Sequence, residues 1–146
     1  MLKLAGRTAV VTGAAGGIGR GIALALARRG CHLALADIDE AALARTAAEI
    51  TDQYAAGVSH YPLDVANRSA VAALPARVMA AHGAVDILVN NAGLALGGTF
   101  LEIAETDFDW LVGINFWGVV QVTRAFLPLL STARRRASSM FRACSD

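Results

Sequence analysis

A glycine-rich turn holds the residues whose types and spacing could do chemistry. It reads TGAAGGIG and follows the β-branched run TAVVT (8–12), with Gly13, Gly17 and Gly19 in a GxxxGxG spacing. Gly13 suits a tight turn out of a strand, Gly17 lets a phosphate group approach the backbone, and Gly19 lets a helix pack closely on a sheet. The free N–H groups and positive dipole of the next helix would then bind a pyrophosphate.

Asp37 is the second candidate, because it ends the apolar run HLALAD (32–37), 24 residues after the first of these glycines. A carboxylate about 20 residues beyond such a turn binds the adenosine ribose and repels a 2′-phosphate. Ile38 follows instead of an arginine, and the glycine turn holds no basic residue, so NAD is favoured over NADP. Two plainer interpretations stay open: glycines suit any strand–turn–helix junction, and Asp37 could be a solvated strand end or a helix cap.

Strand-like and helix-like segments alternate four times along the chain, which predicts an α/β fold with a doubly wound, Rossmann-like parallel sheet limited to four strands. Asp39 is expected to cap the second helix, and Thr106 with Asp109 has the spacing of a capping box. Gly30 is a plausible end for the first helix. The predicted strands cover 8–12, 32–37, 58–64 and 85–90, and the predicted helices cover 18–30, 40–50, 69–82 and a long apolar stretch reaching about 127.

Composition narrows the class of protein. The chain of 146 residues has the size of one domain, and its net charge of +1 gives no general basis for nucleic-acid binding. Two cysteines make no disulfide framework, and no apolar run suits a signal peptide or a membrane span, so we expect a cytoplasmic protein. No histidine or cysteine has a partner at metal-ligand spacing, so no metal site is predicted. Trp110 and Trp117 favour helix packing over a substrate platform.

Three further motifs complete a specific resemblance. LDV (63–65), NNAG (90–93) and Asn115 in GINFWGVVQVTRAFLP follow the glycine turn in order. Together the four motifs, spread over residues 7–130, resemble the short-chain dehydrogenase/reductase family of the classical type. The resemblance implies hydride transfer between a nicotinamide cofactor and a small alcohol or ketone. It also implies a homo-oligomer, which is doubtful for this chain by itself.

The resemblance also assigns roles. Asp64 and Val65 would contact adenine, the NNAG turn would lie beside the cofactor, and Asn115 would be catalytic by supporting a proton-relay water. The expected cofactor-binding set is Gly13, Gly17, Ile18, Gly19, Asp37, Asp64, Val65, Asn90, Ala92 and Gly93.

The rest of the family's catalytic machinery is missing from the sequence. The family uses a serine after its fifth strand and a tyrosine whose pKa is lowered by a lysine four residues later. The two tyrosines here, Tyr54 and Tyr61, are followed at that spacing by valines, and Lys3 is the sole lysine. An unassisted phenol titrates near 10 and is a poor base at neutral pH. We therefore expect the chain as given to be inactive.

The last sixteen residues, STARRRASSMFRACSD (131–146), differ in composition from residues 1–130, the predicted NAD-binding half-domain. Codons compatible with residues 137–146, read from the third base of the first codon, can encode Ile-Val-Asn-Val-Ser-Ser-Met-Phe-Gly. That segment resembles the family's fifth strand and catalytic serine turn. We interpret the segment as an aberrant, Arg-rich tail produced by a frame error. A basophilic kinase site or a basic tail that attracts phosphate or anionic lipid is the competing interpretation.

Two other functions compete with an oxidoreductase. A non-catalytic dinucleotide-binding or regulatory module could use the half-fold and the arginine-rich tail. An S-adenosylmethionine-dependent methyltransferase also uses a glycine turn and an acidic strand end, but it has no reason to carry NNAG followed by Asn115.

Overall fold

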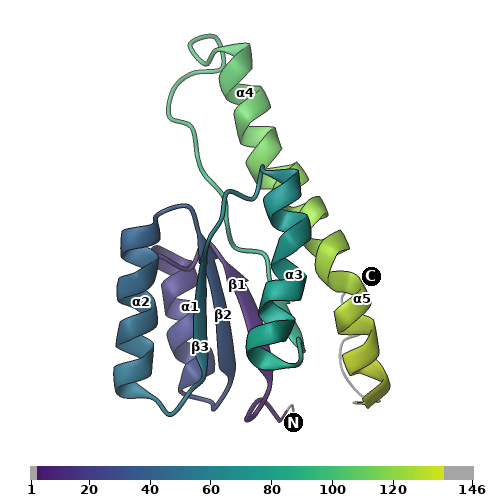
Figure 1. The fold of residues 1–146 in the computed structure, drawn as a ribbon. Coiled ribbons are helices and arrows are strands. Elements are labelled where there is room, and N and C mark those ends of the chain that lie inside the picture. The colour runs from purple at the N-terminus through teal and green to yellow at the C-terminus, as the bar shows by residue number, and fades with distance from the viewer. Residues whose placement is uncertain (1–2, 137–146) are drawn as a thin grey trace.

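Four parallel strands form one sheet in the order β3-β2-β1-β4, with helices on both faces (Figure 1). The computed structural model describes residues 3–136: residues 131–136 of the predicted arginine-rich tail belong to the last helix, and residues 137–146 lie outside the described residues. The strands are β1 (Thr8–Thr12), β2 (His32–Asp37), β3 (Val58–Pro62) and β4 (Ile87–Val89). The helices are α1 (Gly17–Ala27), α2 (Glu40–Gln53), α3 (Arg68–His82), α4 (Glu105–Val112), the π-helical η1 (Gly113–Gly118) and α5 (Val119–Arg136). The predicted doubly wound, Rossmann-like sheet is confirmed.

The sheet separates two apolar cores. Alternate residues of a strand point to opposite faces, so Ala9 and Val11 of β1 pack towards α1 and α2. Val10 between them packs on the other face, with buried residues of α3 and α5 such as Phe126. In Figure 1, α1 and α2 cover one face of the sheet, and α3 and α5 lie on the other. Burial on both faces explains the continuous apolar runs seen in the sequence.

Most predicted element boundaries are confirmed to within a few residues. The cap of α2 is correct, because the Asp39 carboxylate accepts a hydrogen bond from the Ala42 N–H at 2.9 Å. The first helix ends at Ala27, three residues before Gly30, which adopts a left-handed φ of +82° in the following turn. Pro75 lies inside α3 without ending it.

The long C-terminal helix differs from its prediction in its start, in its geometry and in its end, which lies at Arg136 instead of at about residue 127. The capping box at Thr106 and Asp109 is wrong: α4 already begins at Glu105, and its N-cap residue Ala104 makes no side-chain cap. The helix is also not continuous α-helix, because six residues adopt π-helical geometry between α4 and α5. Such π-helical insertions accompany functional sites, and this one contains Asn115.

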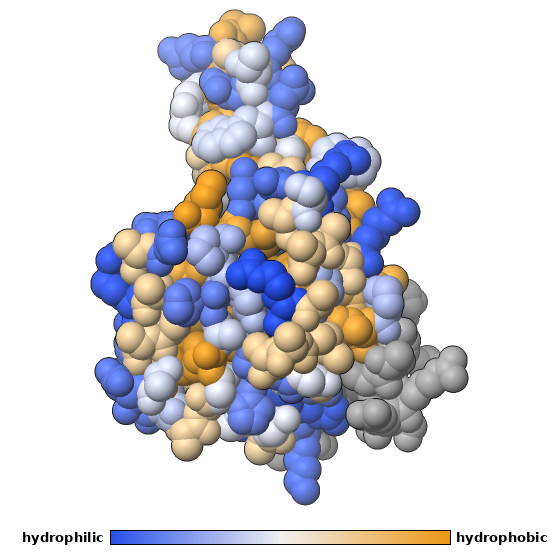
Figure 2. Space-filling view, viewed as in Figure 1, coloured by the Kyte–Doolittle hydropathy of each residue, from blue (hydrophilic) through white to orange (hydrophobic). Residues whose placement is uncertain are grey.

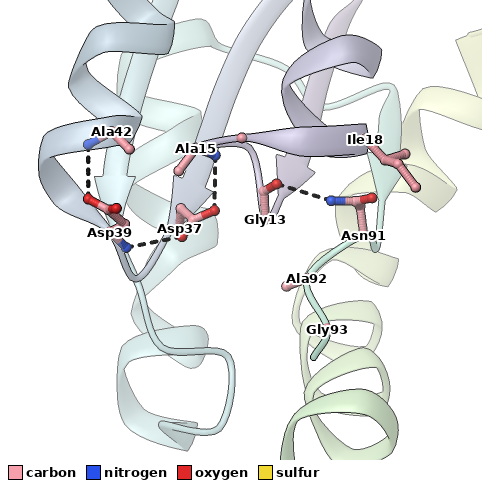
Figure 3. A pocket seen from close by; sticks show the side chains of 10 residues that line it. Gly13, Ala15, Ile18, Asp37, Asp39, Ala42, Asn91, Ala92 and Gly93 are labelled. Carbon is pink, nitrogen blue, oxygen red and sulfur yellow. Dashed lines mark hydrogen bonds between the residues drawn. The ribbon is translucent and has the colours of Figure 1, made fainter. Parts of the chain in front are cut away.

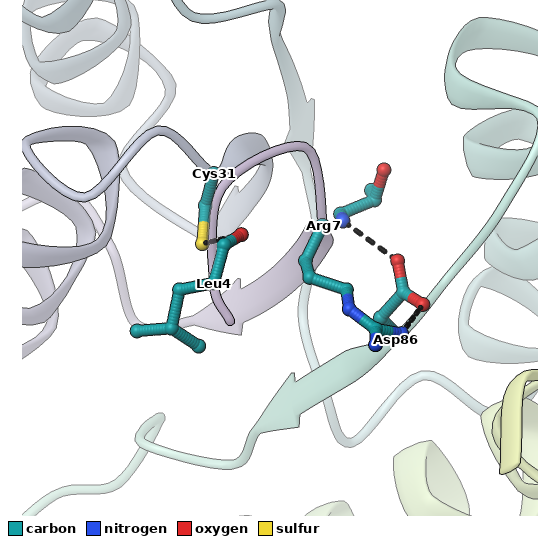
Figure 4. Close-up of polar contacts among 5 residues, drawn as sticks. Leu4, Arg7, Cys31 and Asp86 are labelled. Carbon is teal, nitrogen blue, oxygen red and sulfur yellow. Dashed lines mark hydrogen bonds and ion pairs between the residues drawn. The ribbon is translucent and has the colours of Figure 1, made fainter. Parts of the chain in front are cut away.

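At the edge of the sheet opposite the glycine turn, partly buried hydrogen bonds hold the beginnings of the strands (Figure 4). The Arg7 guanidinium pairs with the Asp86 carboxylate at 2.8 Å, and the same carboxylate accepts the Thr8 N–H at 2.9 Å. These contacts join the beginnings of β1 and β4. The Cys31 thiol is fully buried and donates to the Leu4 carbonyl at 3.3 Å. Burial raises the pKa of this thiol, with Asp86 adding to the effect, so it stays protonated and structural.

The segment around α4 projects from the body of the molecule (Figure 1), and its tip carries apolar surface (Figure 2). Phe100 and Leu101, at the loop before it, are 79% and 94% exposed. Neither tryptophan lies in the core, since Trp110 is 54% and Trp117 is 44% exposed, although Trp117 contacts Phe116 and lies near Arg68 of α3. Strand β4 pairs with β1 alone within residues 3–136. None of the helices in this part of the chain has the length and apolar composition of a membrane span.

His82, at the end of α3, makes a pH-sensitive contact with β3. Its Nε2 lies 2.6 Å from the Ser59 hydroxyl. Burial lowers the pKa of His82 from its ordinary value, and the nearby His32 ring lowers it further. As the pH falls, His82 binds a proton at a higher pH in the unfolded chain than in the folded chain. The folded state therefore loses stability as the pH falls below about 6.5.

We expect His82→Gln to reduce the loss of thermal stability between pH 7.5 and pH 5.5, because the variant cannot bind that proton. Thermal melts at the two pH values measure the effect, with His60→Gln as the control, since His60 is an exposed neighbour of Ser59 on the same strand. An equal loss of stability in wild type and His82→Gln would show that His82 does not contribute.

Candidate dinucleotide-binding site

The glycine turn, the end of β2 and the NNAG turn meet at the carboxyl edge of the sheet (Figure 3). This edge is where doubly wound proteins bind ligands, at the point where the strand order reverses. Here β1 is that point, since β2 and β3 lie to one side of it and β4 to the other. The three segments, with the starts of α1 and α2, border an open cavity of about 500 Å³, lined by Gly13, Ala15, Gly16, Ile18, Asp37, Asp39, Ala42, Asn91, Ala92 and Gly93.

The glycine turn packs closely against the NNAG turn that follows β4. Gly13 has a left-handed φ of +66°, and a Cβ atom there would lie 2.8 Å from the Asn91 side-chain nitrogen and 2.9 Å from the Cα of Ala92. A Cβ at Gly19 would overlap the Gly13 carbonyl oxygen. Gly13 therefore requires glycine because of its left-handed backbone and the NNAG turn beside it. Gly19 requires glycine because the start of α1 packs directly on the turn that leaves β1.

The start of α1 faces open space. Gly17 adopts a left-handed φ of +51°, and a Cβ there would meet nothing within 4 Å. The N-cap residue Gly16 provides no side-chain cap. The first N–H groups of an α-helix have no partner within the helix and carry the positive end of its dipole. This helix end is therefore open to an anionic group.

Two backbone N–H groups orient the Asp37 carboxylate in the cavity. Its Oδ2 accepts the Ala15 N–H at 2.9 Å, and its Oδ1 accepts the Asp39 N–H at 3.0 Å (Figure 3). A carboxylate has about four acceptor positions, so both oxygens keep a lone pair for a further donor. Asp37 thus links the glycine turn to the end of β2, and it can still accept hydrogen bonds from a pair of hydroxyl groups.

Asn91 and Thr12 join the NNAG turn to the glycine turn, and the sequence analysis missed both. The Asn91 side-chain amide donates to the carbonyl oxygens of Thr12 and Gly13, both at 3.1 Å. The Thr12 hydroxyl accepts the N–H groups of Asn91 and Ala92, at 3.0 and 3.1 Å. The signal was present in the second asparagine of NNAG. Its meaning depends on β4 lying beside β1, which local sequence does not reveal.

A second cavity of about 300 Å³ adjoins the first and is more apolar. Its lining is Gly13, Ala36, Asp37, Ile38, Leu63, Asp64, Val65, Ala92, Gly93, Leu94, Trp110 and Ile114, so Gly13, Asp37, Ala92 and Gly93 border both cavities. Asp64 is exposed and turns its Oδ1 towards the Ala66 N–H at 2.9 Å. A Cβ at Gly118 would lie 2.8 Å from a methyl group of Val65, so this glycine allows η1 to approach LDV closely.

Four of the predicted site residues do not line either cavity. Gly17 and Gly19 act through the backbone of the turn, as described above. The Asn90 side chain donates to the Thr123 hydroxyl on α5 at 2.9 Å. The Asn115 amide accepts the Leu94 N–H at 2.9 Å and donates to the Leu94 carbonyl at 2.8 Å, which ties η1 to the segment after β4. Among residues 3–136, no group of three metal-ligating side chains comes together.

Comparison with known proteins gives the same family along almost the whole chain. Residues 7–142 match the family model of the short chain dehydrogenases. The chain is 48% identical over 117 residues to EphD of Mycobacterium tuberculosis, which covers 80% of this chain and 19% of EphD.

Solved structures agree with the fold. A short chain dehydrogenase/reductase from Burkholderia phymatum, in complex with NAD, superposes with a TM-score of 0.85 at 40% identity. An alcohol dehydrogenase from Thermococcus sibiricus, complexed with 5-hydroxy-NADP, gives 0.84 at 35% identity. The alignments cover 89% and 87% of this chain, but 46% and 54% of those proteins, so the chain spans about half their length.

We expect Asn91→Asp to destabilise the fold by about 2 kcal/mol or more, because a carboxylate would face two carbonyl oxygens with no proton to donate. Asn90→Asp is the matched control: the Thr123 hydroxyl can donate to the new carboxylate, so its effect should stay within about 0.5 kcal/mol. Urea denaturation of the two variants measures the difference. Equal stability would contradict the role given to Asn91.

Proposed function

We propose, because this chain belongs to the short-chain dehydrogenase family, that it is the dinucleotide-binding part of an oxidoreductase acting on a small alcohol or ketone. The observation that carries the proposal is the position of Asp37 on the wall shared by the two cavities. A ribose bound at this carboxylate has the open start of α1 in the first cavity and the more apolar second cavity beside it. Phosphate, ribose and base follow one another in this order in the adenosine half of a nicotinamide dinucleotide.

The chain's own residues then have distinct tasks. The open N-terminus of α1 at Gly17 receives the pyrophosphate, and Asp37 accepts hydrogen bonds from the ribose hydroxyls. Asp64 and Val65 contact the adenine in the second cavity. When bound, the nicotinamide ring of the cofactor gives or accepts the hydride. Asn115 holds the segment after β4 in place and supports the relay of the substrate proton.

NAD rather than NADP is the proposed cofactor. Asp37 and Asp39 both line the first cavity, so a 2′-phosphate on the ribose would enter beside two carboxylates. Like charges a few ångströms apart near a protein surface repel by several kcal/mol before screening. Ile38, between them, is 72% exposed and supplies no compensating positive charge. Related structures contain either cofactor, so the proposed preference rests on these side chains and not on the family.

We expect NAD to bind more tightly than NADP. Asp37→Ser should reduce the ratio of NAD affinity to NADP affinity by about tenfold or more, because it removes the repulsion of the 2′-phosphate and the hydrogen bonds to the ribose hydroxyls. Asp39→Ser should reduce it less, since serine keeps the cap of α2. Asp52→Ser, near the far end of α2, is the charge-matched control and should leave the ratio unchanged. Calorimetric titration with both cofactors measures the ratios. Tighter binding of NADP by the wild type would overturn the assignment.

Catalysis by the 146-residue chain itself is not expected. Alcohol oxidation requires the hydroxyl proton to leave, and general-base assistance is typically worth about 10²- to 10⁴-fold. The Asn115 amide does not titrate near neutral pH, and the sequence contains no tyrosine with a lysine four residues later. A non-catalytic dinucleotide-binding or regulatory module is the alternative function, and it likewise predicts that the chain binds NAD.

We expect no measurable oxidation of alcohols or reduction of ketones by the purified chain, although it binds NAD. Extending the chain in the shifted reading frame, from about residue 131 into the downstream DNA, should restore a serine, a tyrosine–lysine pair and turnover. Spectrophotometry of NADH at 340 nm measures the activity of both forms. Turnover by the short chain would overturn the proposed inactivity, and a downstream sequence without YxxxK in any frame would overturn the frame-error interpretation.

The remaining expectations complete the proposal. A cytoplasmic location is proposed, since the sequence offers no disulfide framework and Cys31 is a free thiol. The partners are the cofactor and a small-molecule substrate, with no nucleic acid, and the complete enzyme is proposed to be a homo-oligomer.

A further inference from the structure

The outer wall of the second cavity is formed by a tryptophan at the end of α4. Trp110 and Ile114 are four residues apart, so they lie on the same side of the helix, and both line the cavity. Asp64 and Val65, which follow β3, line the same cavity. The indole therefore borders the same space as the two residues that are proposed to contact adenine.

The two tryptophans of the chain have different surroundings. Trp117 packs edge-on against Phe116, with ring centroids 5.3 Å apart, and Arg68 lies 5.9 Å from its ring. Trp110 has no ring or cation contact within residues 3–136, yet 54% of it is exposed beside an apolar cavity. A large aromatic surface that no side chain covers is available to an aromatic ligand.

We propose that Trp110 is a cofactor-contacting residue whose indole covers the adenine of the bound dinucleotide. This inference rests on the proposed dinucleotide binding and adds to it a contact that the family motifs do not contain. Stacking of a base on an aromatic side chain is worth about 1–3 kcal/mol, and it tolerates any base because every base has a π-face. Trp110 thus strengthens binding of the adenosine half without distinguishing NAD from NADP.

Fluorescence separates the two tryptophans. In Trp117→Phe the signal comes from Trp110 alone, and in Trp110→Phe it comes from Trp117 alone. We expect NAD and ADP-ribose to quench the emission of Trp117→Phe and to leave that of Trp110→Phe nearly unchanged. Nicotinamide mononucleotide, which lacks adenine, should quench neither. Quenching of the Trp110 emission by nicotinamide mononucleotide would overturn the proposed contact. So would a Trp110 emission that changes with the protein concentration but not with the nucleotide concentration.

Affinity provides the second measurement. We expect Trp110→Ala to weaken ADP-ribose binding about fivefold or more, and Trp110→Phe to weaken it less, since phenylalanine keeps a stacking face. Thermal melts verify that both variants fold. If the wild type binds neither NAD nor ADP-ribose, the proposed function fails. If the wild type and Trp110→Ala bind ADP-ribose equally and the Trp110 emission does not respond, the proposed function survives and this inference fails.

Discussion

Two hydrogen bonds from the Asn91 side chain to the carbonyl oxygens of Thr12 and Gly13 hold the candidate site together. They fasten the end of β4 to the turn that leaves β1, and the strand pairing of β1 with β4 ends just before them. The same turn supports the start of α1, because Gly19 packs on the Gly13 carbonyl. The open N-terminal end of α1, the NNAG turn and the edge of the cavity are thus joined by one partly buried polar junction.

The order of the strands brings the parts of the candidate site to this junction. With β1 between β2 and β4, the carboxyl ends of three strands meet, and each supplies one part of the site. The glycine turn follows β1, Asp37 ends β2, and Ala92 and Gly93 follow β4. Asp37 adds a second junction by accepting the Ala15 N–H, which joins the end of β2 to the glycine turn. A binding site therefore forms from short, local segments that are distant in the sequence.

The parts of the fold that local chemistry decides were predictable from the sequence. β1 and β2 match their predicted ranges because both are apolar runs bounded by glycine or by charge, and α2 begins at its Asp39 cap. Predictions failed where tertiary context decides. The start of α4 has no side-chain cap, and the π-helical turn around Asn115 depends on contacts with Leu94 and Val65 that no local pattern indicates. Asn91 was passed over for Asn90 because its partners belong to another strand.

Mapping of ligand contacts on the backbone amides by NMR tests the central claim that these two cavities form one dinucleotide site. Addition of NAD to the labelled 146-residue chain should shift the amide signals of residues 15–19, 37–39 and 64–66 together, since pyrophosphate, ribose and base bind at once. The amide of His82, at the opposite end of α3 from its Asn67 cap, should not shift. Absence of shifts in the glycine turn and at Asp37, at NAD concentrations that saturate related enzymes, would contradict the account.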